Sequence, residues 1–441
     1  MKIGSRLLLL VLFGLSLFVL TACEAVVSQF RSPSERYQIE GDRLLSEGRT
    51  VEAILSYRAA LKDNPASVPT LKALAKLFAA QGRRRLAQRH LEIAAGWAPR
   101  DHEIINSLVA LGSNPVSMAP LALSWQVALG DSEPVGMAVS AGRIYVSLDD
   151  GTILCLNASD GQVVWRQNLP GQATSAPGIT GDQVWVGGQD GVLYTLSADS
   201  GQLGWKFATK APIYVPPTAG GERVFLASGD GTLYALNRAG GSPLWSFPTG
   251  GALHSQPVLS DGILFFGSND SRLYALNASD GTPFWKDGIL TQGAIENQPL
   301  VTEGRVYIGS GDSRVYSLAA ASGGEYWRFS TADAVYAAPL LAGNVLYAAS
   351  AGNSLTALDK LSGKKIWEVR TRSALSWAPL PVGERLYYVA SGDPRLYAVD
   401  PKTGAALFNV DTGDWFTAGP VLENEKIYLL GKDGTLVALT D

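Results

Sequence analysis

The sequence predicts an all-β eight-bladed β-propeller preceded by a small all-α module. Two internal repeats carry this prediction. A motif of the form Asp-x-x-Leu-Tyr-x-Leu recurs about every 40 residues over 120–441, and small and large apolar residues recur every 34 residues over 34–112. The composition agrees, because 48 glycines, 11 tryptophans and 16 tyrosines in 441 residues favour many short strands joined by tight turns.

Charge and cysteine content exclude several classes of protein. The net charge of −4 does not favour a nucleic-acid binder with a basic face. Two cysteines and three histidines exclude a disulfide scaffold and a structural zinc site of four Cys/His ligands on adjacent loops. Cys155 stands where sibling repeats have Thr195, Ala235 and Ala275, so we expect a small buried thiol without a disulfide partner.

The pattern of the first residues is typical of an export signal. Lys2 and Arg6 precede an apolar run over 7–20, which is too short to span a bilayer comfortably and fits a signal-peptide core. The run ends in Leu20-Thr21-Ala22-Cys23, which resembles a bacterial lipobox. That resemblance implies a signal peptide over 1–22, cleavage before Cys23, a diacylglycerol on its thiol and a lipidated linker over 23–33. The alternative is an ordinary secretory signal followed by an unrelated Cys.

Lipidation places the rest of the chain outside the cytoplasm on a membrane surface. Glu24, rather than Asp, follows Cys23, which is compatible with transfer to an outer membrane. We therefore expect the outer membrane if the cell has two membranes, and otherwise the outer face of the plasma membrane. The sequence leaves open which of the two envelopes applies.

Residues 34–112 read as paired helices with a period of 34. Counted back from Pro65, the repeat places Ala60, Tyr57, Ala53, Gly48, Leu44 and Gly41; counted back from Pro99, it places Ala94, Leu91, Ala87, Gly82, Phe78 and Ala75. This pattern resembles the tetratricopeptide repeat, with Tyr37 and Leu71 where that family often has Trp. A further helix over about 101–111 offers Ile104, Ile105 and Leu108 to cover the second pair. Residues 113–119 are a linker.

Residues 120–441 divide into units of 40 to 42 residues, each expected to form four short strands with turns at Gly-Asp or Asp-Gly. The first column begins at Asp150, Asp190, Asp230, Asp270, Asp312, Asn353, Asp393 and Asp433. A Pro column follows Pro177, Pro217, Pro257, Pro299, Pro339, Pro379 and Pro420. We interpret each unit as one propeller blade and the column Asp residues as turn formers that accept a local backbone N–H.

The two ends of the repeat array indicate how the ring closes. The last unit stops after 436–439 and lacks its Gly-x-x-x-Trp strand. An orphan copy of that strand stands at 123–127, with Trp125 located 40 residues before Trp165. We expect this first strand to complete the last blade, which gives eight four-stranded blades and removes free sheet edges.

The Gly-x-x-x-Trp column resembles the tryptophan-docking motif of the pyrroloquinoline-quinone-type propeller repeat, for example over 281–285 and 363–367. Each indole of such a column buries a large area between neighbouring blades and can donate one hydrogen bond. The expected docking residues are Trp125, Trp165, Trp205, Trp245, Trp285, Trp327, Trp367 and Phe408.

Quinoprotein dehydrogenases share this repeat, so an enzyme must be weighed. Those enzymes also carry a metal near the quinone, a catalytic Asp, often an adjacent Cys pair, and long loops around the cofactor. This chain has no Cys pair, and its regular units leave no room for such loops. His90 and His102 lie in the helical part and His254 stands alone, so there is no Ser/His/Asp set. We expect no catalytic residue, no metal site and no cofactor.

A lipobox followed by an eight-bladed propeller of this repeat resembles the BamB family, the lipoprotein subunit of the outer-membrane β-barrel assembly machinery. The stretch 426–436 is similar to the end of that subunit. The family has no tetratricopeptide module, and its blades are less regular. The resemblance implies a protein-binding scaffold outside the cytoplasm, with partners met at rim loops and no nucleic acid bound.

The segment before each column Pro is expected to enter the innermost strand at the channel mouth. These segments differ between blades and carry large aromatic and single polar groups, as contact surfaces do. The expected partner-binding rim consists of Tyr214, His254, Glu296, Tyr336, Trp377, Trp415 and Phe416. The alternative is that these side chains plug the channel and pack against each other.

Charge is unevenly distributed along the chain. Residues 34–112 carry 12 Lys/Arg against 9 Asp/Glu, whereas 113–441 carry 21 against 30. The run Arg83-Arg84-Arg85 with Arg89 faces either anionic lipid or plain solvent.

The sequence thus predicts a non-catalytic, membrane-anchored scaffold, with envelope proteins as partners at the propeller mouth and at the helical module. A quinone-dependent dehydrogenase and a ligand or saccharide sensor are the alternatives. The identity of the partner and the oligomeric state stay open.

Overall fold

The computed structural model describes residues 32–98, 103–104, 107–108 and 121–440. The chain divides into two compact units, residues 1–122 and 123–441. The first unit contains the helices α2 (Pro33–Ser46), α3 (Thr50–Asp63), α4 (Val68–Ala80) and α5 (Arg84–Trp97). The lipobox with Cys23 and the 113–119 linker lie outside the described residues.

The four helices form two antiparallel pairs, α2 with α3 and α4 with α5. A capping box starts α2, because the Ser32 side chain accepts from the Glu35 N–H and the Glu35 carboxylate accepts from the Ser32 N–H. Within the first pair the ring of Tyr57 lies directly against Gly41, where an added Cβ would stand 2.6 Å from the ring. Gly41 is therefore a point of close approach between α2 and α3, whereas Gly48 and Gly82 of the same pattern lie in the turns after α2 and α4, with φ of +76° and +69°.

A third layer covers the second helical pair. Ile104 and Leu108 are buried against Leu71, Leu91 and Ala94. Ile105, which the sequence placed with them, lies outside the described residues, as does most of the expected helix over 101–111. Within the described parts of the chain, no helix has the length and apolarity needed to cross a membrane.

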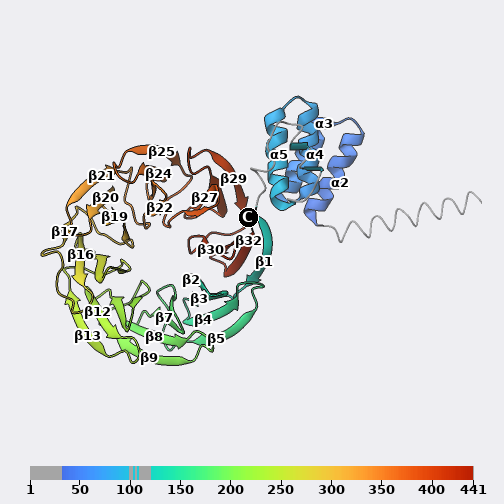
Figure 1. The fold of residues 1–441 in the computed structure, drawn as a ribbon. Helices are drawn as coiled ribbons and strands as arrows, with labels where there is room; N and C mark the ends of the chain where they lie inside the picture. Colours follow the sequence, from blue (N-terminus) through green and yellow to red (C-terminus); the bar gives the residue numbers. More distant parts are fainter. Residues whose placement is uncertain (1–31, 99–102, 105–106, 109–120, 441) are drawn as a thin grey trace, which may run out of the picture. The chain divides into compact units, whose positions relative to one another are not determined.

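The second unit consists of eight four-stranded antiparallel sheets arranged as a ring (Figure 1), as the sequence predicted. Blade 1 contains β2 (Pro134–Ser140), β3 (Arg143–Leu148), β4 (Thr152–Asn157) and β5 (Val163–Asn168). Blade 2 contains β6 (Gly178–Thr180), β7 (Gln183–Gly187), β8 (Val192–Ser197) and β9 (Leu203–Ala208). Blade 3 contains β10 (Thr218–Gly220), β11 (Arg223–Ala227), β12 (Thr232–Asn237) and β13 (Pro243–Pro248). Blade 4 contains β14 (Val258–Ser260), β15 (Ile263–Gly267), β16 (Arg272–Asn277) and β17 (Ile289–Leu290).

The remaining blades repeat this order, with a short innermost strand first. Blade 5 contains β18 (Leu300–Thr302), β19 (Arg305–Ser310), β20 (Arg314–Ala319) and β21 (Glu325–Ser330). Blade 6 contains β22 (Leu340–Ala342), β23 (Val345–Ser350), β24 (Ser354–Asp359) and β25 (Lys365–Arg370). Blade 7 contains β26 (Leu380–Val382), β27 (Arg385–Val389), β28 (Arg395–Val399) and β29 (Ala406–Asp411). Blade 8 contains β30 (Val421–Glu423), β31 (Lys426–Leu430), β32 (Thr435–Thr440) and β1 (Ala122–Ala128).

The N-terminal strand closes the ring, which confirms the predicted strand exchange. β1 pairs with β32, and the Leu129 N–H donates to the Gly434 carbonyl at 2.9 Å (Figure 1). Trp125 of β1 packs on the ring of Tyr428 with centroids 6.0 Å apart, in a cluster that includes Leu436. Because the first and last segments share one sheet, blade 8 has the same four strands as its neighbours.

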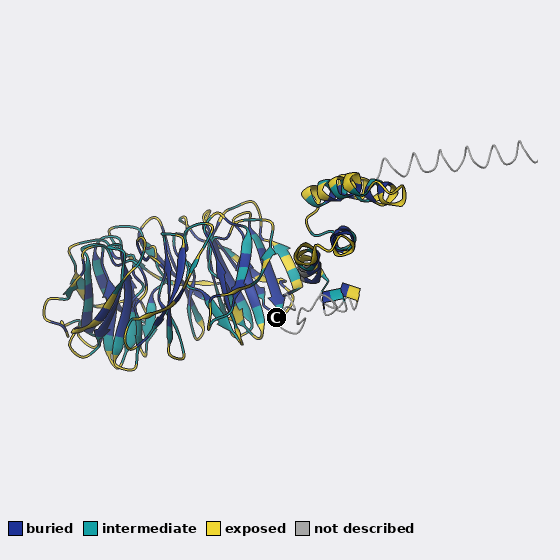
Figure 2. Cartoon of the chain, turned by 90° about the horizontal axis from the view of Figure 1, so that it is seen from above, coloured by how far each residue is buried: buried dark blue, intermediate teal, exposed yellow. Residues whose placement is uncertain are grey.

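Most of the hydrophobic core lies along the second and third strands of each blade. Figure 2 shows buried residues concentrated on the strands inside the propeller, with exposed residues in the loops and on the outer strands. In β25, for example, Trp367 is buried while its neighbours Ile366 and Glu368 are exposed. One face of each outer strand therefore packs inward against the next blade.

Seven indoles of the tryptophan column join each blade to the next. Each Nε1–H donates to a backbone carbonyl of the following blade at 2.9 to 3.3 Å. The pairs are Trp125–Ala158, Trp165–Ala198, Trp205–Arg238, Trp245–Ala278, Trp285–Ala320, Trp327–Lys360 and Trp367–Pro401. The Phe408 side chain has no N–H to donate, and its ring packs edge-on against Tyr387 with ring centroids 6.2 Å apart. The indole face covers a Gly of the following blade, as Trp327 covers Gly363.

Candidate functional site

The candidate site lies on the loops that lead into the innermost strands, which we call the entry loops. The entry loops are residues 129–133, 169–177, 209–217, 249–257, 291–299, 331–339, 371–379 and 412–420. Each entry loop is tied to the turn between the second and third strands of its blade. In blade 3 the Lys210 N–H donates to the Asp230 carboxylate at 3.0 Å, and in blade 4 the Gly250 N–H donates to Asp270 at 2.8 Å. We call the surface formed by the entry loops and these turns the entry-loop face.

Apolar anchors hold the entry loops in place. Four residues before the column Pro, most blades have a buried apolar residue with exposed fractions of 0 to 6%. These anchors are Ala173, Ile213, Leu253, Ile295, Val335, Leu375 and Phe416. The anchor is held so closely that an added Cβ on Gly187 would stand 2.5 Å from Ile213. Each of these loops is therefore fixed in the packed core at its anchor position, whereas the residue type at the next position differs between blades.

A belt of buried hydrogen bonds links neighbouring entry loops. Ser255 Oγ donates to the Asn297 carbonyl at 2.7 Å, and Thr174 Oγ1 donates to the Ile213 carbonyl at 2.7 Å. Asn297, only 3% exposed, donates through Nδ2 to the Gly309 carbonyl at 2.8 Å and to the Val335 carbonyl at 2.9 Å. The belt fixes each loop relative to the next, because a buried polar group that loses its partner is costly.

Four of the seven sequence-predicted rim residues occupy one position, three residues before the column Pro, in four consecutive blades. Tyr214 and His254 meet edge to face with ring centroids 4.9 Å apart. His254 Nδ1 lies 3.6 Å from Glu296 Oε1 and 3.4 Å from the Asn269 amide nitrogen. Tyr336 follows in the next blade and is 46% exposed. The structure therefore brings Tyr214, His254 and Glu296 together across three blades.

The other three predicted rim residues lie elsewhere in their loops. Trp377 stands two residues before its Pro, is half-buried, and packs against Gly419 of the next entry loop. Trp415 is 51% exposed. Phe416 is 6% exposed and occupies the position of the apolar anchors, so it offers no surface to a partner.

The entry-loop face is acidic. Its loops and turns hold thirteen acidic side chains (Asp131, Glu133, Asp149, Asp150, Asp190, Asp230, Asp270, Glu296, Asp312, Asp333, Asp393, Asp414 and Asp433) and three basic ones (Lys210, Arg372 and Lys432). Acids outnumber bases even when Arg272, Arg314 and Arg395, which begin the adjoining strands, are added. This face suits a positively charged partner.

The column aspartates act as turn formers, and Asp230 in blade 3 is an example. Asp230 accepts from the Thr232 N–H at 2.9 Å and from the Tyr234 hydroxyl at 2.8 Å. Burial alone would raise the pKa of Asp230, but the hydrogen bonds from Lys210, Tyr234 and Thr232 outweigh it and lower the pKa. The carboxylate is thus ionised at neutral pH, and burial together with Asp230 raises the pKa of Tyr234.

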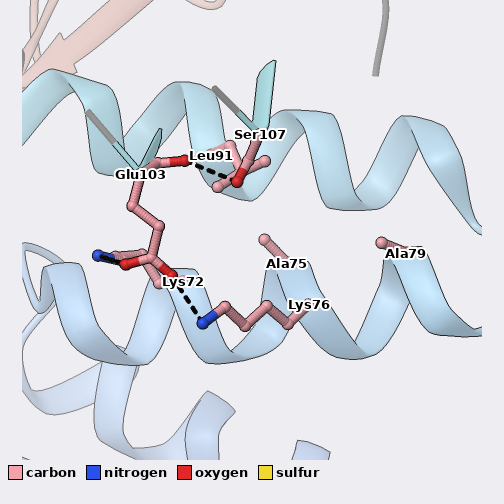
Figure 3. Close-up of a pocket in the computed structure, with 7 residues that line it drawn as sticks. All are labelled: Lys72, Ala75, Lys76, Ala79, Leu91, Glu103 and Ser107. Carbon is pink, nitrogen blue, oxygen red and sulfur yellow. Dashed lines mark hydrogen bonds and ion pairs between the residues drawn. The ribbon is translucent and has the colours of Figure 1, made fainter. Parts of the chain in front are cut away.

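The helical module has two hollows on either side of α4. The larger, about 580 Å³, is lined by Asp42 and Leu45 of α2, Tyr57 of α3, and Val68, Pro69, Lys72, Ala73, Lys76 and Leu77 of α4. The smaller, about 210 Å³, lies between α4, α5, Glu103 and Ser107. Figure 3 shows Glu103 between Lys72 and Lys76, and its carboxylate lies 2.7 Å from Lys76 Nζ. The hydrogen bonds from Lys72 and Lys76 lower the pKa of Glu103.

Two observations in the described part of the chain bear on catalysis. No three His, Cys, Asp or Glu side chains gather there as metal ligands. Cys155 is fully buried, and burial raises the pKa of its thiol, so the reactive thiolate form is disfavoured.

Comparison with known proteins agrees with this architecture. The family model described as outer membrane protein assembly factor BamB matches residues 122–216, 189–295, 284–379 and 362–441. These matches together span the whole propeller. The chain belongs to this family. No curated protein matches it in sequence.

Two solved structures resemble the propeller. The crystal structure of BamB from Moraxella catarrhalis superimposes with a TM-score of 0.65 and 19% identity, covering 73% of this chain and 98% of that one. The computationally designed Ika8 protein superimposes with a TM-score of 0.65 and 17% identity, covering 72% and 99% of the two chains. At these identities the likeness shows the fold. The helical module is additional to the propeller that the BamB family shares.

Sequence reasoning missed the inter-loop belt and Asn269. Asn297 and Ser255 look like ordinary loop residues in the sequence, and Asn269 stands in a turn beside a column Asp. Asn297 and Ser255 both stand two residues before the column Pro, and this shared position could have indicated the belt. Nothing in the sequence pairs Asn269 with His254.

Proposed function

We propose that this protein is a non-catalytic scaffold of the cell envelope whose entry-loop face binds another protein. The observation that carries the proposal is the connected arc of Tyr214, His254 and Glu296, continued by Tyr336 in the next blade. These side chains stand at one register position on loops that the buried anchors and the belt hold rigid. Aromatic and single polar groups on a rigid support match the composition of protein-contact hot spots.

Charge supports a basic partner. The entry-loop face holds thirteen acidic side chains, Glu296 of the arc among them, against three basic ones. Opposite charges speed encounter and fix orientation, and salt weakens both effects. Association at this face is therefore expected to weaken as salt rises.

The chain is proposed to act at a membrane surface outside the cytoplasm. The lipobox ending in Cys23 supports a diacylglycerol anchor, and membership of the BamB family supports an outer-membrane location and a role in assembly. The helical module, proposed to be a pair of tetratricopeptide repeats, offers its larger hollow as a second protein-binding surface.

Site-specific photo-crosslinking in the native envelope tests the proposal. A photoreactive residue is placed at Tyr214, Tyr336 or Trp415 on the entry-loop face, and at Tyr326 or Ile366 on the outer strands as controls. Tyr326 and Ile366 are 54% and 49% exposed, which matches Tyr336 at 46% and Trp415 at 51%. We expect a protein adduct from the entry-loop positions alone.

A combined alanine variant of Tyr214, His254, Glu296 and Tyr336 gives the second readout. It is expected to retain the unfolding midpoint, because these side chains are at least partly exposed, and to lose the partner that crosslinking identifies. The proposal is refuted if the control positions yield the same adduct, or if the folded alanine variant captures as much partner as the parent chain.

A further inference from the structure

The outward faces of α3 and α5 carry an unusual mixture of arginine and large apolar side chains. At 100° per residue, Arg85, Leu86, Arg89, Ile93 and Trp97 fall within about 120° of the α5 circumference. All five are exposed, while Ala87, Leu91 and Ala94 on the other side are buried. A solvated helix face would instead be uniformly polar.

The outer face of α3 carries the same mixture. Val51 is 71% exposed and Leu55 is 60% exposed, and Arg58 and Lys62 lie on the same side of the helix. On their inner sides α3 and α5 share one buried cluster, which contains Tyr57 of α3 and Ala87 of α5. We call the exposed residues of the two helices together the arginine face: Val51, Leu55, Arg58, Lys62, Arg83, Arg85, Leu86, Arg89, Ile93 and Trp97.

The arginines of this face differ from Arg43 and Arg49, which lie near the turn between α2 and α3. Arg43 forms ion pairs with Glu40 and Glu47, and Arg49 with Glu47 and Glu52. Among the described side chains, Arg58, Arg83, Arg85 and Arg89 have no carboxylate within ion-pair distance. Four uncompensated guanidinium groups beside exposed Leu, Ile and Trp side chains form a surface that attracts anions and also favours leaving water.

We propose that the arginine face binds the anionic surface of a phospholipid bilayer. Guanidinium groups pair with lipid phosphates, and the apolar side chains enter the boundary between headgroups and acyl chains. Each Lys or Arg near an anionic leaflet contributes about 1 kcal/mol, so four arginines together raise the binding constant about a thousandfold. The contact is separate from the entry-loop face, whose negative charge such a surface would repel.

Charge complementarity also fits a second copy of the chain, since its propeller is acidic. The apolar residues favour lipid, because Leu55, Leu86, Ile93 and Trp97 have a counterpart in acyl chains and none in a ring of solvated aspartates. The experiment below separates the two occupants.

The test uses the full chain with Cys23→Ser and Ile93→Cys, labelled with a polarity-sensitive dye; Cys155 is buried and stays unlabelled. The chain is bound to vesicles of phosphatidylcholine alone or with 30% phosphatidylglycerol, so that its N-terminal segment is present in both cases. We expect a blue shift of the dye with phosphatidylglycerol and none with phosphatidylcholine, reversed by 0.5 M NaCl.

Two variants make the result specific. Replacing Arg58, Arg83, Arg85 and Arg89 by Gln is expected to abolish the shift, lowering the docking constant a hundred- to a thousandfold while leaving the helical circular dichroism unchanged. The matched control replaces four exposed propeller cations outside the entry-loop face, Lys206, Lys286, Lys364 and Lys402, by Gln and is expected to behave as the parent.

An equal shift on both kinds of vesicle, or an undiminished shift in the four-arginine variant, overturns the proposal. A shift without vesicles that grows with protein concentration overturns it in favour of a second copy. No protein partner takes part, so either result leaves the entry-loop proposal intact.

Discussion

Replacing Gly363 by Ala is expected to disturb the docking between blades 5 and 6. Gly363 has a φ of +68°, and an added Cβ would stand 2.5, 2.7 and 2.9 Å from Cδ2, Cε3 and Cγ of Trp327. The indole is held in place, because its Nε1–H donates to the Lys360 carbonyl at 3.1 Å and its ring packs against Tyr307. The substitution therefore combines backbone strain with overpacking.

A second glycine of the same blade separates the two costs. Gly343 has a φ of +60°, and an added Cβ there would meet nothing within 4 Å. Ala at either position pays about 1–2 kcal/mol for the left-handed conformation. At Gly363 alone, overpacking adds about 1–3 kcal/mol. The expected destabilisation is then about 1–2 kcal/mol for Gly343→Ala and about 2–5 kcal/mol for Gly363→Ala.

Urea unfolding followed by far-ultraviolet circular dichroism measures the difference, with midpoints compared at equal slope. Trp327→Ala provides a further control, because without the indole Gly363→Ala should cost no more than Gly343→Ala. If the two alanine variants unfold within about 0.5 kcal/mol of each other in the parent background, a margin set by experimental additivity, then the Gly column serves turn geometry alone and the docking argument is wrong.

Two further predictions concern the entry-loop face. Asp230 has a folded-state pKa below the ordinary value of 3.8, so its contribution to stability is present above that pH and is lost as the pH falls through the folded pKa. Asp230→Asn is expected to lower the free energy of unfolding by about 1.5–3 kcal/mol at pH 7. Unfolding measured over a series of acidic pH values should show this loss of stability shrinking below pH 3.8. A loss of stability that stays constant with pH would contradict the prediction. Asn297→Ala leaves buried backbone groups of Gly309 and Val335 unpaired and is expected to lower the free energy of unfolding by about 2–4 kcal/mol. Val215→Ala, at the same register position of blade 3, serves as the control in the same unfolding assay.

Much of the fold could be predicted from the sequence, because a local pattern that is weak in one copy becomes strong evidence when it recurs in every repeat. One Gly-x-x-x-Trp strand means little, but its recurrence with a fixed period, and an orphan copy at Trp125, predicted both the number of blades and the closing strand. The column Asp residues were understood as turn formers for the same reason. Each conclusion depended on spacing along the chain, which the sequence records directly.

The site was less accessible because it depends on contacts between blades. Tyr214, His254 and Glu296 are 40 and 42 residues apart, and their meeting depends on how entry loops pack after the ring has closed. The same reasoning from sequence grouped Phe416 with them, although Phe416 stands four residues before Pro420, at the position of the apolar anchors, and is buried. The residue type did not distinguish a buried anchor from an exposed rim residue, because large aromatic side chains occur at both positions.

The amino-acid sequence by itself determined the repeat periods, the eight blades, their closure and the residue columns that build them, since these follow from local turn chemistry and regular spacing. Only the tertiary structure decided which loop side chains meet across blades, that a hydrogen-bond belt supports them, and which arginines lack an acidic partner among the described side chains. Those features depend on packing and on distances through space, where the energy of a side chain is set by neighbours far away along the chain.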